Sequence, residues 1–69
     1  MANHVAKVTE LVGTSEDSVD DAIKTAVKRA GKTLRNMRWL EVSQIRADIK
    51  DGKVDHFQVM LKVGFSLDD

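Results

Sequence analysis

Apolar positions divide the 69-residue chain into four segments, three with the character of strands and one with the period of a helix. Residues 4–12 mix β-branched and polar side chains up to Gly13, which is typical of a strand. Residues 39–50 and 53–65 have the same character and predict two further strands. Between the first two strands, apolar side chains recur at spacings of three and four, which predicts a helix. The helical row consists of Val19, Ala22, Ile23, Ala26, Val27 and Ala30, and Leu34 and Met37 extend it.

The ends of the predicted helix have their own signals. Ser15 is expected to be the N-cap, and the acidic residues 16–17 would then lie in the first turn, where the helix dipole favours negative charge. Asp20 and Lys24 are four residues apart and are expected to pair on the solvent face. Gly31 marks the expected C-terminal end, although the row could continue for one more turn.

The order of these elements defines the predicted fold class. Asp51-Gly52 is the strongest short-range signal for a two-residue hairpin between the second and third strands. A helix between two strands makes a right-handed crossover, so the first and second strands run parallel. The third strand then fits between them. We therefore predict an α+β fold with the order strand–helix–strand–strand. It consists of a three-stranded antiparallel sheet with one helix packed on one face, in a single domain over residues 1–69.

A two-residue turn would also fix which residues share a face of the sheet, since opposed residues point to the same side. It pairs Lys50 with Lys53, Ile45 with Gln58, Ser43 with Met60, Val42 with Leu61, and Leu40 with Val63. One face is then strongly apolar and is expected to lie under the helix. Its members are Leu40, Val42, Phe57, Val59, Leu61, Val63 and Phe65.

The opposite face is mixed and carries the only tryptophan of the chain. Its predicted members are Trp39, Glu41, Ser43, Ile45, Ala47, Ile49, His56, Gln58, Met60 and Lys62. One helix cannot cover both sides of a sheet, so this second face is expected to meet water, a ligand or another chain.

Length and composition favour association with other chains. A chain this short buries a small fraction of its surface, and small domains usually need disulfides, a metal ion or oligomerisation for support. Cysteine is absent and two histidines are too few for a structural zinc site, which leaves oligomerisation. The 11 basic and 11 acidic residues balance, so nothing favours nucleic acid or an anionic membrane as a partner. Without an apolar span or a signal peptide, we expect a soluble cytoplasmic protein.

Candidate chemistry is limited to a few side chains, and no catalytic constellation is present, so we expect a protein that is not an enzyme. Trp39 is either an interface residue or a stacking surface for a flat aromatic ligand. Gln58 is either an ordinary strand residue or a paired donor and acceptor for a ring edge. Arg46 is either a surface charge or a phosphate ligand. His56 and His4 are expected to be surface residues, and His4 could contact a ligand edge in an assembly.

The predicted register separates these candidates. Trp39 lies six residues from Ile45, the expected partner of Gln58, and hence roughly 20 Å away at ~3.3 Å per residue. If both contact the same ligand, the pocket must be built from different subunits, unless a bulge or a longer turn shifts the register.

Three segments of the chain, VTELVGTSEDSVDDAI, RWLEVSQIRADI and HFQVMLKVGFSLDD, together resemble the dodecins. The resemblance implies a hollow homododecamer of cubic symmetry that holds stacked pairs of flavins between tryptophans of symmetry-related subunits. It implies that Trp39 stacks on the flavin and that Gln58 hydrogen-bonds its ring. Arg46 falls where bacterial members carry an arginine near the ligand phosphate, which favours FMN over riboflavin. Some bacterial members also bind coenzyme A, so that ligand stays open.

Two positions depart from the family pattern. Ser66 stands where many bacterial dodecins have a second arginine, and the loss of that contact would weaken phosphate binding by about 1.5–3 kcal/mol. Arg38 precedes the tryptophan where an acidic residue is common, and it either compensates or is a surface charge. The function implied is flavin storage or sequestration with photoprotection through quenching by Trp39. The alternative is a structural homo-oligomer, or a coenzyme A binder, without a flavin role.

Overall fold

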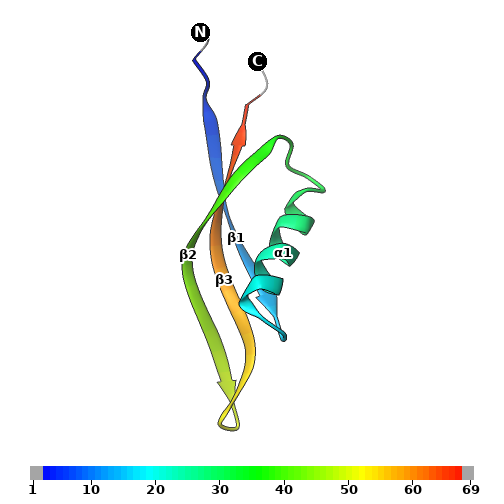
Figure 1. The fold of residues 1–69 in the computed structure, drawn as a ribbon, viewed down its shortest axis with the longest axis vertical. Helices are drawn as coiled ribbons and strands as arrows, with labels where there is room; N and C mark the ends of the chain where they lie inside the picture. Colours follow the sequence, from blue (N-terminus) through cyan, green and yellow to red (C-terminus); the bar gives the residue numbers. More distant parts are fainter. Residues whose placement is uncertain (1–2, 68–69) are drawn as a thin grey trace.

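A computed structural model describes residues 3–67, so both ends of the domain expected over residues 1–69 lie outside the described residues. Its elements are β1 (Ala6–Ser15), α1 (Val19–Ala30), β2 (Met37–Lys50) and β3 (Lys53–Ser66). The sheet order is β1-β3-β2, and β3 is antiparallel to both neighbours. Helix α1 lies along one side of the sheet, and the β2–β3 hairpin extends past the end of the helix (Figure 1). The predicted fold class and strand order are confirmed.

The start of the helix differs from the sequence-based prediction. β1 continues through Gly13 to Ser15, so Ser15 belongs to the strand and is not the N-cap. Ser18 is the N-cap, and its hydroxyl accepts a hydrogen bond from the Asp21 backbone N–H at 3.0 Å. The prediction was wrong because Ser15 has another role. Its hydroxyl donates to the Asp21 carboxylate at 2.7 Å and accepts from the backbone N–H of Asp17 at 2.9 Å.

The body and the end of the helix agree with the sequence pattern. The acidic side chains of the first turn are Asp20 and Asp21, one turn later than expected. Asp20 pairs with Lys24 at 3.1 Å, as predicted from their spacing. The helix ends at Ala30 with Gly31 as its C-cap, so the apolar row does not continue as helix beyond that residue.

The core lies where small helix residues meet the middle of β3. Ala22, Ala26 and Ala30 are buried, and Ala22 and Ala26 form one cluster with the buried side chains of Val59, Leu61 and Val63. Small side chains let the helix lie close to the sheet, and it approaches β1 closely at Gly13. A Cβ atom on Gly13 would lie 2.1 Å from the Ala22 carbonyl oxygen. Each large buried side chain contributes about 1.5–3 kcal/mol by leaving water, so this small cluster holds the helix on the sheet.

The β2–β3 turn confirms one part of the predicted register. Asp51 has φ 53° and Gly52 has φ 74°, the left-handed conformations that a tight hairpin turn needs. Lys50 lies opposite Lys53, as expected for a two-residue turn. Val42–Leu61 and Leu40–Val63 also pair as predicted.

Between these points the register is shifted, and two predicted pairs are wrong. Asp55 is an extra residue on β3 and Ser43 is an extra residue on β2, so two bulges enclose a stretch that is offset by one residue. Within it Ile45 lies opposite Val59 instead of Gln58, and Met60 lies opposite Gln44 instead of Ser43. The second bulge cancels the first, which is why the pairs beyond it are as predicted.

The offset changes the composition of the two faces. Ile45 and Ala47 pair with Val59 and Phe57 and therefore point to the side that α1 covers. The face turned away from α1, called the outer face below, is formed by alternate residues of all three strands. Its members are Val8, Glu10, Val12 and Thr14 of β1, Trp39, Glu41, Gln44, Arg46 and Asp48 of β2, and His56, Gln58, Met60, Lys62 and Gly64 of β3. Within the described range, no helix is both long and apolar enough to cross a membrane.

Candidate functional site on the outer face

Trp39 is held near one end of the outer face by its partner on β3. It lies opposite Gly64, and its indole packs directly over that glycine. A Cβ atom on Gly64 would come within 2.2 Å of the indole carbons Cη2 and Cζ2. Only glycine leaves room for the ring here, so one side of the indole is backed by the sheet. The side chain is nevertheless 49% exposed, and an aromatic surface is left open to a flat partner.

Arg38, directly before the tryptophan, lies at a third irregularity of β2. Met37 pairs with Phe65 and Trp39 with Gly64, so Arg38 is an extra residue without a partner on β3. Bulges re-aim side chains, and Arg38 lines a hollow of about 250 Å³ beside the indole. The other residues that line this hollow are Val27, Met37, Trp39, Leu40 and Val63. Val27 of α1 and the core residue Val63 also line this hollow, so it opens on the side of the sheet that the helix covers.

Gln58 and Arg46 form a second polar group on the outer face, nearer the hairpin. The bulges place them opposite each other, and Arg46 Nε donates a hydrogen bond to Gln58 Oε1 at 2.9 Å. Arg46 was not assigned to either face from the sequence, and the structure places it on the outer face. The pair presents the remaining guanidinium N–H groups and the side-chain amide N–H groups in one place.

His56 and two carboxylates lie beside this pair. Asp48 is opposite His56, and its Oδ2 is 3.1 Å from His56 Nε2. The bulged residue Asp55 places its Oδ2 2.8 Å from His56 Nδ1. The hydrogen bond to Asp55 raises the pKa of His56 above 6.5; burial opposes this, and the charges of Asp48, Asp55 and Glu16 raise the pKa further. His56 is a surface residue, as expected, and it has two carboxylate partners that the sequence did not predict.

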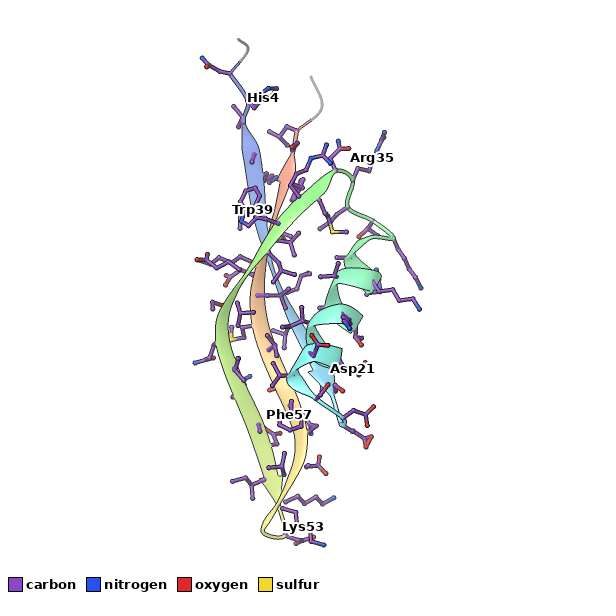
Figure 2. All side chains as sticks on the ribbon, viewed as in Figure 1. His4, Asp21, Arg35, Trp39, Lys53 and Phe57 are labelled. Atoms are coloured by element: carbon purple, nitrogen blue, oxygen red, sulfur yellow. The ribbon has the colours of Figure 1, made fainter. Side chains whose placement is uncertain are left out.

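Ser66 and His4 lie at the same end of the molecule as Trp39. Ser66 is the last residue of β3, and its backbone N–H donates to the Asn36 carbonyl at 3.0 Å. His4 precedes β1 and is exposed, and Figure 2 shows it beyond Trp39 along the long axis. The Arg46–Gln58 pair lies further towards the hairpin, since Gln58 follows Phe57 in the chain and Figure 2 shows Phe57 well beyond Trp39 in that direction.

The candidate residues therefore form two groups within one chain. Trp39 and Arg46 are seven residues apart on β2, hence roughly 20 Å at ~3.3 Å per residue. The separation predicted from the uniform register is preserved although the partner of Gln58 has changed. Sequence reasoning missed the Arg46–Gln58 contact and the His56 cluster because no turn or glycine signal marks either bulge.

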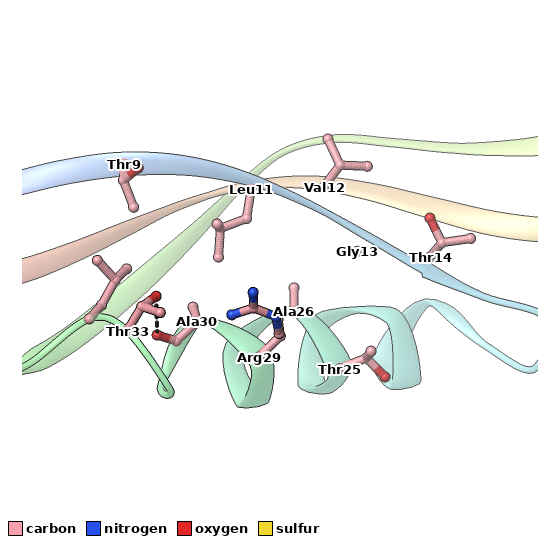
Figure 3. Close-up of a pocket in the computed structure, with 11 residues that line it drawn as sticks. Thr9, Leu11, Val12, Gly13, Thr14, Thr25, Ala26, Arg29, Ala30 and Thr33 are labelled. Carbon is pink, nitrogen blue, oxygen red and sulfur yellow. Dashed lines mark hydrogen bonds between the residues drawn. The ribbon is translucent and has the colours of Figure 1, made fainter.

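A hollow of about 640 Å³ lies elsewhere, between β1 and α1, and Figure 3 shows it in close-up. It is lined by threonines, small residues of the helix and Arg29. None of the residues expected to bind a ligand lines it. The exposed aromatic ring and the donor–acceptor pair are both on the outer face, so we place the candidate site there. Across residues 3–67, no group of three or more His, Cys, Asp or Glu side chains is arranged to hold a metal ion.

The fold and the outer face define a small sheet-and-helix protein with an exposed aromatic side chain on the uncovered face. The dodecin family model matches residues 5–68. A dodecin of Thermus thermophilus is 49% identical over 65 residues, which are 94% of each chain. The dodecin structures of Streptomyces coelicolor and Streptomyces davaonensis superpose with TM-scores of 0.94 and 0.93, at 55% and 47% identity. These matches cover 100% and 99% of this chain, and 99% and 100% of those chains. The chain belongs to the dodecin family.

Proposed function

We propose that this dodecin binds flavin, stores it and protects it from light, and that it takes FMN in preference to riboflavin. The observation that carries the proposal is the half-exposed indole of Trp39, which is backed by Gly64 on a face that no helix covers. Offset stacking of aromatic rings is favourable, and an isoalloxazine is a large flat partner for an indole. Stacking on Trp39 removes the flavin from solution. Electron transfer from the indole to the excited ring, followed by its return, quenches the excited state.

The second polar group suits the rest of an FMN molecule. The Gln58 amide carries both donors and an acceptor, as the polar edge of an isoalloxazine requires. Arg46 uses Nε for its contact with Gln58, so its terminal N–H groups are left for an anion. Riboflavin lacks the phosphate and would gain nothing from that charge, which supports the preference for FMN.

The distance between the two groups supports a site shared between subunits. One isoalloxazine cannot reach both Trp39 and Gln58 of a single chain across roughly 20 Å of strand. Exposed apolar side chains of β2, namely Leu40, Val42, Ile45 and Ile49, provide a contact surface for another copy. We therefore propose that the flavin lies between copies of this chain in a homododecamer, the assembly that the dodecin resemblance implies.

Phosphate recognition rests on fewer charges than in many bacterial dodecins. Ser66 brings no charge to the end of β3, so Arg46 and Arg38 are the arginines that we assign to this role. Arg38 directly precedes Trp39 and lines the same hollow, and this proximity is the basis for its proposed role. His4 lies at the same end and is proposed only as a contact for the ligand edge.

Fluorescence titrations with FMN and riboflavin test the proposal. The apo-protein is expected to quench both flavins to saturation, in proportion to the concentration of chains, with FMN bound more tightly. Trp39→Ala should abolish tight binding of both flavins, and Trp39→Phe should retain part of it because a smaller ring still stacks. Absence of quenching by wild-type protein that is still assembled would contradict a flavin role and favour a structural shell or coenzyme A.

A further inference from the structure

Four side chains form a block on the outer face near the hairpin. Arg46 and Asp48 come from β2, and Gln58 and His56 lie opposite them on β3. Arg46 is bound to Gln58 at 2.9 Å, and Asp48 to His56 at 3.1 Å. The block is therefore divided into two cross-strand pairs, and each pair joins β2 to β3.

Another pairing is open to the same residues. Arg46 and Asp48 are two residues apart on one strand, so their side chains point to the same face. A guanidinium and a carboxylate make a strong charge-assisted pair, often through two hydrogen bonds. Such a pair would occupy Arg46 and cancel its charge. Among the residues that the structure describes, no ion pair joins Arg46 to Asp48, and the Asp48 carboxylate contacts His56.

We propose that His56 is a specificity-determining residue of the flavin site, because by holding Asp48 it keeps the Arg46 guanidinium available for the flavin phosphate. The preference for FMN over riboflavin then depends on the proton of His56. The inference rests on the proposed flavin function. It adds that the contact between Arg46 and the FMN phosphate is regulated by His56.

The charges around His56 explain why its proton matters. Asp48 of β2, Asp55 of β3 and Glu16, which follows β1, are the negative groups that act on the imidazole, and Arg46 is the neighbouring cation. A protonated imidazole donates from both nitrogens, to Asp48 and to Asp55. A neutral imidazole has one N–H, so one carboxylate then faces a lone pair. When the imidazole no longer donates to Asp48, Arg46 is the oppositely charged residue two positions away on the same strand.

The test compares affinities for FMN and riboflavin at several pH values from about 5.5 to 8.5, the range in which histidine titrates. Riboflavin reports stacking without a phosphate, so the ratio of the two affinities isolates the phosphate contact. A phosphate monoester has its own second ionisation near pH ~6. The ionisation of the FMN phosphate affects binding to the wild type and to Asp48→Asn alike. Asp48→Asn has no carboxylate that competes for Arg46, and this variant is therefore the reference.

Relative to Asp48→Asn, the FMN-to-riboflavin affinity ratio of the wild type is expected to fall roughly two- to fivefold as His56 loses its proton. His56→Gln should show the lower ratio already at acidic pH. The double variant His56→Gln/Asp48→Asn should regain the higher ratio, because no carboxylate is left to capture Arg46. Asp20→Asn removes the same charge from the solvent face of α1 and should behave as the wild type.

The outcomes separate the two proposals. If both flavins bind but His56→Gln keeps the wild-type ratio at every pH, or the double variant does not regain it, the role of His56 is overturned and flavin binding stands. If neither flavin binds the wild-type protein, the flavin function fails and the role of His56 with it.

Discussion

β2 and β3 are strands of equal length, 14 residues each, and they pair from the turn to their far ends. Their burial is opposite. β3 contributes Val59, Leu61 and Val63 to the core, whereas every residue of β2 from Arg38 to Lys50 is exposed. The cause is position, because β3 lies between β1 and β2 and passes under α1, while β2 is an edge strand.

The exposed strand still has the apolar composition of a buried one. Ile45 and Ile49 of β2, in the half nearer the hairpin, are open to solvent, and so are Leu40 and Val42 further along. Long edge strands with apolar side chains promote association with other chains. The comparison indicates that β3 stabilises the single chain, whereas the apolar side chains of β2 are left exposed on it.

Truncation of one apolar residue on each strand tests this division most directly. Leu61 of β3 is 0% exposed in the core, and Leu61→Ala is expected to lower the free energy of unfolding by about 2–5 kcal/mol through lost burial and a new cavity. Urea unfolding at a fixed chain concentration measures the change. Association of copies, as proposed above, would add to stability by mass action, so the concentration must be the same for each variant.

Ile45→Ala is the matched control on β2, where the side chain is 56% exposed. Removal of an exposed side chain usually changes stability by no more than ~0.5 kcal/mol, so its main effect should be on the concentration at which chains associate. Equal destabilisation by both variants at every concentration would contradict the division between the strands.

Substitution of one glycine on each face of the sheet compares the face covered by α1 with the outer face. Gly13→Ala would press a methyl group against the Ala22 carbonyl on the helix, a backbone contact that cannot give way easily. Overpacking of this kind costs about 1–3 kcal/mol, and we expect the loss in unfolding free energy with little change in flavin affinity per folded chain.

Gly64→Ala would press its methyl group against the Trp39 ring, which is a side chain and can move. Displacement of the ring is expected to weaken flavin binding more than it weakens the fold. Parallel titration with FMN and urea unfolding of both variants measures the two effects. A Gly64→Ala protein with unchanged flavin affinity would show that the indole need not lie on Gly64 for binding.

The sequence predicted most of the architecture because its signals were local. The spacing of Ala22, Ala26 and Ala30 indicated the helix and its packed side, and Asp51-Gly52 indicated the turn. Chain order and crossover handedness then determined the strand order. The N-cap was misplaced because Ser15 and Ser18 are both good caps by residue type, and only the contact of Ser15 with Asp21 distinguishes them.

The residues proposed to bind a ligand were chosen from the sequence, and their arrangement in space was not predicted. Trp39 on an uncovered face followed from strand alternation alone. The Arg46–Gln58 contact depends on bulges at Ser43 and Asp55, and neither position carries a residue that signals a bulge. A shift of one residue exchanges the two faces of a strand, so each undetected bulge moves side chains to the wrong side until the next one restores them.

The turn that joins the two strands should have a smaller effect on stability than the core. Gly52 has φ 74°, and Gly52→Ala places a side chain in the left-handed region, which costs about 1–2 kcal/mol. Nothing lies within 4 Å of the added Cβ, so the loss arises from backbone conformation alone. Asp51→Asn is the control because asparagine tolerates its φ of 53°. Urea unfolding in which Gly52→Ala matches the wild type would contradict the assigned turn.

The smallest effect concerns the link between β2 and β3 at His56. Its contacts with Asp55 and Asp48 raise the pKa of His56 above 6.5, so the folded chain holds the proton more tightly than the unfolded chain does. The resulting stabilisation is complete below the unfolded pKa near 6.5 and is lost as the pH rises through the higher folded pKa. Urea midpoints of the wild type minus those of His56→Gln should therefore decrease from acidic to alkaline pH. A difference that grows with pH would mean that the neutral imidazole is the form that joins the strands.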